Sequence, residues 1–216
     1  MNIVFKCKMC GHCCKKSPVS LLPHEDILLR RLAEFFNLEY RSTPGYKFYD
    51  ALSRSYIAVS YVMELVDNKC VFLRDNKCLI HDIYKPFICR CFPYVPRSVK
   101  YNIVWSSKVI YHTVEYGISS ECTFMKEYGS FLRNILEHDS SYIYRFLGRE
   151  INVAREMEEK RLILLNMLSN AWRNGRVELA EGSCSTNRVV NLYEFLRTIY
   201  PDLPYFLGFN RLAIEV

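Results

Sequence analysis

The chain carries the run Cys7-Lys8-Met9-Cys10-Gly11-His12-Cys13-Cys14 near its start, which places four cysteines within eight residues. Two residues between thiols allow a tight turn to direct both sulfurs toward one metal ion. Glycine after the second cysteine can adopt the positive φ that such turns often need. The run therefore predicts an irregular domain that is centred on a metal site.

A second group of cysteines follows at Cys70, Cys78, Cys89 and Cys91. The segments beside the first two flank the turn Arg74-Asp75-Asn76-Lys77, which predicts a β-hairpin. Paired strands lie about 4.8 Å apart, so thiols at the base of this hairpin can approach one another.

The adjacent pair Cys13-Cys14 limits what the first group can do alone. Neighbouring side chains diverge from the backbone, so the two thiols are not expected to share one tetrahedral ion. Either they serve two metals, or one is a ligand while the other packs. We therefore expect the second group to complete the coordination, with the whole segment 7–91 as the functional unit.

Length and composition favour reduced thiols over disulfides. The chain has 216 residues and ten cysteines, and a chain of this length can bury a core without cross-links. We find no signal peptide and no apolar run long enough to cross a membrane, so we expect a cytoplasmic protein without membrane association. Cytoplasmic thiols are normally reduced, which favours metal binding. Cys122 and Cys184 are expected to pack as small apolar side chains.

The net charge gives little support for a nucleic-acid partner. It is +6 with the thiols counted as neutral, and four thiolates around one divalent ion would lower it to about +4. Tyrosines are frequent, but aromatic residues on strands usually belong to the core. We therefore expect no nucleic acid to bind.

The pattern of elements predicts an α+β protein. We expect residues 1–125 to form the metal-binding domain with short antiparallel strands, and residues 126–216 to form a helical region. A long helix is expected over Glu150–Trp172, with an apolar stripe that either packs on the domain or binds a protein partner. The other expected elements are a helix from Pro23 to about Asn37, extended chain over Ser55–Leu65, a short helix or turn near Ile83–Cys89, a hairpin of Val99–Trp105 with Lys108–Val114, and helices over Tyr128–Glu137, Tyr142–Gly148 and Val189–Tyr200.

These motifs resemble the cysteine-cluster family named for its CxxCxxCC signature, a zinc- or iron-chelating domain. The resemblance rests on the first cysteine run, on Leu22-Pro23-His24-Glu25-Asp26-Ile27, and on the stretch that contains Lys85-Pro86-Phe87-Ile88-Cys89-Arg90. It covers about residues 3–125. Lys85 stands where the family usually has arginine, and Thr123-Phe124 replaces the usual Pro-Gly after Cys122.

The resemblance implies that the cysteines of both groups bind the metal. Zinc and iron–sulfur clusters both accept four thiolates. Seven matching thiols exceed one zinc site, so we favour a [4Fe–4S] cluster and keep zinc as the other interpretation. The ligand candidates are Cys7, Cys10, Cys13, Cys14, Cys70, Cys78 and Cys89, followed by Cys91, Cys122, His81 and His12.

The predicted function is metal binding through these thiols. One alternative is a cluster-dependent enzyme, because the family is distantly similar to flagellin lysine N-methylases; its reaction would be redox chemistry or S-adenosylmethionine-dependent lysine methyl transfer. Another is a nucleic-acid- or protein-binding module with structural zinc. The sequence contains no nucleophile-elbow, P-loop or H-E-x-x-H motif, so we assign no catalytic residue.

Overall fold

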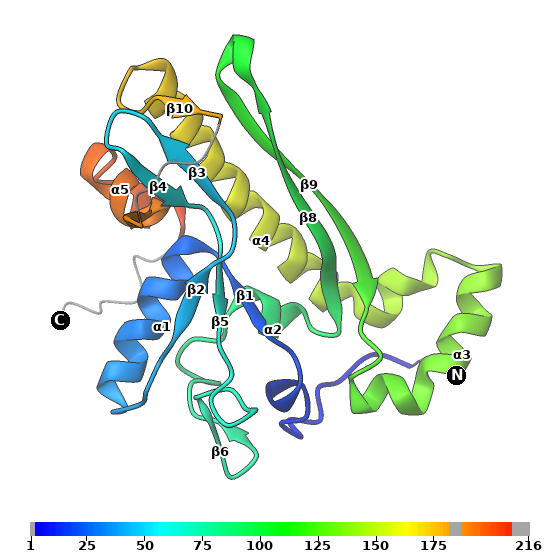
Figure 1. Ribbon diagram of the computed structural model, residues 1–216. Helices are drawn as coiled ribbons and strands as arrows, with labels where there is room; N and C mark the ends of the chain where they lie inside the picture. The colour runs from blue at the N-terminus through cyan, green and yellow to red at the C-terminus, as the bar shows by residue number, and fades with distance from the viewer. Residues whose placement is uncertain (1–2, 182–186, 209–216) are drawn as a thin grey trace.

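The computed structural model of the protein describes residues 3–181 and 187–208 (Figure 1). Helices account for 42% and strands for 24%, which confirms the α+β class. The strands form several small sheets, and a long helix crosses the molecule beside the longest hairpin (Figure 1). Cys184, for which we expected apolar packing, lies outside the described residues.

Two small sheets form the centre of the fold. The first is antiparallel, in the order β1 (Val19–Leu21), β5 (Tyr61–Met63) and β2 (Ser42–Pro44). The second has the order β10 (Leu179–Ala180), β3 (Lys47–Asp50), β4 (Ser55–Ala58) and β11 (Val189–Asn191). Strands from both halves of the chain thus pair in one sheet, and the expected division near residue 125 stays a prediction.

Both predicted hairpins are confirmed. In the first, β6 (Leu73–Arg74) pairs with β7 (Lys77–Cys78) across Asp75 and Asn76. These two residues have φ of 49° and 59°, as a type I′ turn requires. The second hairpin, β8 (Tyr94–Val104) with β9 (Val109–Ile118), is longer than predicted and turns through the 3₁₀ helix η2 (Trp105–Ser107).

The predicted helices are observed, but some begin several residues from the expected position: the helix expected from Tyr128 begins at Thr123, and the short helix expected near Ile83 begins at Phe87. The first, α1, starts at Pro23, whose missing N–H costs nothing at that position. The two helices predicted on either side of residue 149 lie end to end, separated by a kink with non-helical dihedrals at Leu147. The helices are α1 (Pro23–Phe35), α2 (Phe87–Cys91), α3 (Thr123–His138), α4 (Tyr142–Arg173), α5 (Leu192–Ile199) and α6 (Leu203–Phe206), together with the 3₁₀ helix η1 (Cys13–Lys15).

The prediction of a helix over Val189–Tyr200 was wrong at its start. Its first three residues form β11, which pairs in parallel with Tyr56–Ala58 of β4. The helix proper begins at Leu192, because Asn191 caps it: the Asn191 side chain accepts a hydrogen bond from the Tyr193 N–H at 2.8 Å. Val189 and Val190 are β-branched and favour extended backbone, and the pairing with β4 stabilises that conformation.

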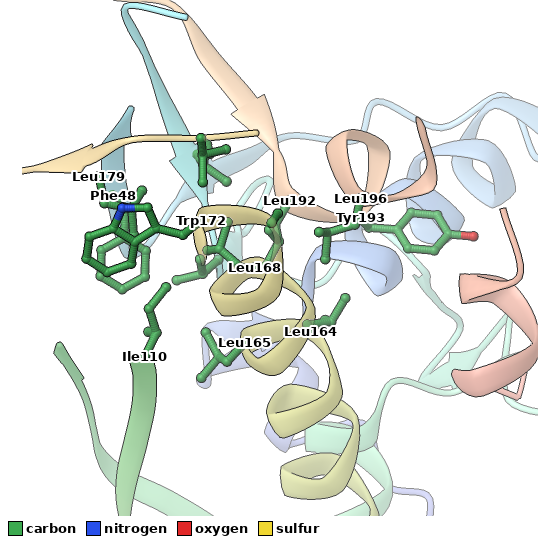
Figure 2. Packing of buried hydrophobic residues seen from close by; sticks show 14 of the residues in the cluster. Phe48, Ile110, Leu164, Leu165, Leu168, Trp172, Leu179, Leu192, Tyr193 and Leu196 are labelled. Atoms are coloured by element: carbon green, nitrogen blue, oxygen red, sulfur yellow. The ribbon is translucent and has the colours of Figure 1, made fainter. Parts of the chain in front are cut away.

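The apolar stripe of α4 is buried inside the chain. Figure 2 shows Leu164, Leu165, Leu168 and Trp172 of α4 packed among side chains of β3, β9, β10 and α5. The packing interpretation of this stripe is therefore confirmed, and this face of α4 is not open to a partner. None of the described helices combines the length and apolar character needed to cross a membrane.

Candidate metal centre

The N-terminal cysteine run lies on the turn of the short β6–β7 hairpin. Gly11 has φ +68°, and a Cβ placed there would lie 3.1 Å from Leu73 Cδ1 and 3.3 Å from the Asn76 carbonyl oxygen. Lys15 Nζ donates a hydrogen bond to Asn76 Oδ1 at 2.8 Å. The expected positive φ at this glycine is thus observed, and the close approach adds a second reason for glycine.

Backbone hydrogen bonds connect the run to the second cysteine group. The Cys70 N–H donates to the Cys14 carbonyl at 2.7 Å, and the Leu73 N–H donates to the Cys70 carbonyl at 2.9 Å. Cys78 lies opposite Leu73 in the hairpin register. Thiols that are more than fifty residues apart in sequence therefore come from segments in direct contact.

Five thiols gather between η1, the hairpin and α2. Burial raises the pKa of Cys89, and the nearby charges of Cys70 and Cys13 raise it further. Burial likewise raises the pKa of Cys70 to about 11, with a contribution from Cys78. Cys14, Cys78 and Cys89 also pack against the buried cluster that contains Cys70. We call Cys13, Cys14, Cys70, Cys78 and Cys89 the inner thiol group.

The adjacent pair does not diverge as we expected. Cys13 Sγ and Cys14 Sγ lie 4.0 Å apart on η1. The hydrogen bond from the Cys14 thiol lowers the pKa of Cys13 to about 6, and it raises the pKa of Cys14. The hydrogen bond between the two thiols therefore favours the charged form of Cys13.

Polar groups of the protein favour thiolates in the inner group. Burial raises the pKa of Cys78, while the Ile80 N–H and the charge of Lys85 oppose this effect. The Phe72 N–H acts in the same way on Cys70. An N–H two residues after the cysteine donates to sulfur in both cases, and such bonds stabilise the charged form.

Three other thiols lie at the start of α3, and we call Cys7, Cys10 and Cys122 the outer thiol group. Cys10 Sγ is 3.3 Å from Thr123 Oγ1, and this hydrogen bond lowers the pKa of the Cys10 thiol. Cys122 is buried, as expected, and occupies the N-cap position of the helix. Its pKa is raised by burial first, and then by the charge of Cys7.

The remaining candidates lie apart from the inner group. Cys91 is fully buried, and its pKa is raised to about 12 by burial first and then by the Glu25 charge. His12 Nε2 lies 3.6 Å from Glu121 Oε2, and the His81 backbone N–H donates to the Cys78 carbonyl oxygen at 3.2 Å.

The inner group fits a soft metal by its donor chemistry. Within residues 3–181 and 187–208, no group of three or more His, Cys, Asp or Glu side chains is already arranged around a single ion position. Five reduced thiols nevertheless lie together, and one of them is acidic. Thiolates are the ligands that zinc and iron accept in tetrahedral sites.

Sequence reasoning missed one buried residue beside this group. The sequence indicated Glu25 only as part of the stretch Leu22–Ile27 that resembles the family, whereas its side chain is completely buried and contacts the first residue of α2. A glutamate three residues after an N-cap is a signal for the contact within α1. No local pattern predicts the contact with α2, because 62 residues separate the partners.

A family model described as "Putative zinc- or iron-chelating domain", with the signature CxxCxxCC, matches residues 6–123. The match includes both thiol groups and Cys91. No curated protein and no solved structure matches the chain.

Proposed function

Because the chain belongs to the CxxCxxCC family of zinc- or iron-chelating domains, we propose that it binds one tetrahedral zinc ion through the inner thiol group. Metal binding in general follows from the family. The finer assignment is that four of the five thiols, with Cys13 and Cys14 among them, become thiolate ligands of a single ion.

The observation that carries this proposal is the 4.0 Å separation of Cys13 Sγ and Cys14 Sγ. Zinc–sulfur bonds of about 2.3 Å in a tetrahedron place neighbouring sulfurs about 3.8 Å apart. In a [4Fe–4S] cluster each cysteine binds a different iron, so the thiolates stand farther from one another. This separation leads us to favour zinc over the cluster that the number of thiols alone suggested.

The proposed role of the ion is structural. The ligands come from η1, which has 3 residues, from the two-residue strands of the β6–β7 hairpin, and from α2, which has 5 residues. Elements this short are not stable by themselves. A bound zinc ion would supply a closed four-thiolate cross-link between them.

Within this centre the chain's own residues have distinct roles. The Cys14 hydrogen bond lowers the pKa of Cys13 to about 6, which favours the thiolate form that a metal binds. The N–H groups of Phe72 and Ile80 stabilise charge on Cys70 and Cys78. Lys85 offsets part of the negative charge that the thiolates bring. A reduced centre of this kind leads us to infer a cytoplasmic location.

Purification with and without oxygen, followed by metal counting, tests the proposal. We expect a colourless protein with about one zinc per chain from both preparations, and loss of that zinc in Cys13→Ser. A brown anaerobic protein with iron and acid-labile sulfide would overturn the zinc assignment. That result would instead favour the cluster-dependent enzyme, including methyl transfer, and binding of S-adenosylmethionine would then be measured.

A further inference from the structure

Glu25 is a completely buried carboxylate in the first turn of α1. Its Oε2 accepts a hydrogen bond from the Leu22 N–H at 3.0 Å. Its Oε1 accepts one from the Tyr84 hydroxyl at 3.0 Å and another from the Phe87 N–H at 2.8 Å. One side chain therefore satisfies donors from the beginnings of two helices.

These contacts connect two of the three segments that carry the inner thiols. Phe87 is the first residue of α2, and Cys89 follows two residues later. On the other side, α1 continues from β1, which comes directly after η1 and its two cysteines. The carboxylate thus lies between the chain that leads from Cys14 and the helix that presents Cys89.

Burying a carboxylate is costly unless it is fully hydrogen-bonded. Burial raises the pKa of Glu25, while the bonds from Leu22, Phe87 and Tyr84 and the charge of Arg90 on α2 oppose this effect. Since α2 has 5 residues, its orientation depends on such tertiary bonds.

We propose that Glu25 is a positioning residue of the metal centre. Its side chain holds α2 so that the Cys89 thiol faces the other four thiols of the inner thiol group. This inference rests on the proposed function. Glu25 would then act on the metal through Cys89, as the hydrogen-bond partners of metal ligands do. Loss of such a partner typically weakens metal binding about 10- to 100-fold.

The test is a titration of the reduced, metal-free full chain with Co²⁺ alone, followed by competition with a chelator. Cobalt reports thiolate ligands through its sulfur-to-metal charge-transfer bands. We expect Glu25→Gln to weaken cobalt affinity about 10- to 100-fold and to reduce the charge-transfer intensity toward that of Cys89→Ser. Tyr84→Phe removes one donor and should produce a smaller loss of affinity.

Asp50→Asn is the matched control. Asp50 is also buried and accepts bonds from the Leu52, Ser53 and Glu178 N–H groups, but it lies in β3. We expect this variant to lose thermal stability and to keep the wild-type cobalt affinity and spectrum. If both variants lost cobalt affinity equally, the effect of Glu25→Gln would reflect a general loss of stability. That result would overturn the inference.

The outcomes separate the two proposals. If the wild-type chain binds neither cobalt nor zinc, the proposed function fails. If it binds cobalt and a folded Glu25→Gln has the same affinity and spectrum, the positioning role fails. Should Glu25→Gln not fold, Tyr84→Phe decides: wild-type affinity in that variant would overturn the inference, and weakened affinity with a changed spectrum would support it.

Discussion

Cys89 and Cys91 lie two residues apart on α2 and face different surroundings. Two residues turn an α-helix by about 200°, so their side chains leave it in nearly opposite directions. The Cys89 thiol interacts with the charges of Cys70 and Cys13, whereas the Cys91 thiol interacts with Glu25. The helical period thus separates one candidate ligand from the inner thiol group.

Serine substitution should distinguish the two cysteines of α2. We expect Cys89→Ser to lose at least half of its bound metal under chelator challenge, because it removes a thiol of the inner group. Cys91→Ser should retain the metal of the wild type, since Cys91 Sγ donates only to the Ile88 carbonyl, at 3.5 Å. Metal counting on both purified variants provides the measurement, and metal loss confined to Cys91→Ser would contradict the assignment.

Gly11→Ala should weaken the contact between the cysteine run and the hairpin. An L-residue at φ +68° costs about 1–2 kcal/mol, and the new methyl would crowd Leu73 and Asn76. We expect faster hydrogen exchange in the β6–β7 hairpin and weaker metal binding. Gly129→Ala in α3 is the control, because a Cβ there meets nothing within 4 Å; it should leave both measurements unchanged or stabilise the helix slightly.

Glu158 should make the stability of the fold depend on acid pH. Burial opposes its ionisation, but bonds with His112, Arg161 and Tyr116 lower its pKa from 4.5 to about 2. Its contribution to the free energy of unfolding is therefore complete above pH 4.5 and is lost as the pH falls toward 2. We expect Glu158→Gln to cost about 2 kcal/mol at pH 7.

Denaturant titrations across pH, with chelator present for every protein, check this expectation. The difference between wild type and Glu158→Gln should shrink steadily below pH 4.5. Glu159→Gln, at the exposed neighbouring position on α4, should follow the wild-type curve. A constant difference from pH 7 to pH 2 would show that the cost comes from packing and not from the charge of Glu158.

Substitution of Asn191 should lower the free energy of unfolding more than substitution of any other residue at the β11–α5 junction. Its side chain caps α5 through the Tyr193 N–H, and its Nδ2 donates to the Pro23 carbonyl at 3.0 Å. Asn191→Ala should therefore cost about 2 kcal/mol of unfolding free energy. Asn191→Ser retains a cap acceptor and should lose about half as much. Equal losses in the two variants, measured by thermal or denaturant unfolding, would assign the effect to the Pro23 bond.

Local sequence patterns predicted the elements whose boundaries are set by the backbone preferences of individual residues. Pro23 at the start of α1, the Asp75-Asn76 turn and Gly175 after α4 mark boundaries through their own backbone preferences. The parallel pairing of Val189 with Tyr56 had no local signal, because it depends on the position of a strand more than a hundred residues earlier. The same limit applied to the bond between Glu25 and Phe87.

The sequence by itself determined the chemistry of this protein: cysteine spacing and the hairpin between Cys70 and Cys78 predict a thiol-based metal site, because both depend on short-range turn geometry. Only the tertiary structure decided which thiols are neighbours. It brought Cys13 and Cys14 to one side of η1 and turned Cys91 away from the inner group. Buried hydrogen bonds and contacts across long sequence separations bring the other thiols together, and the spacing of the cysteines does not encode these contacts.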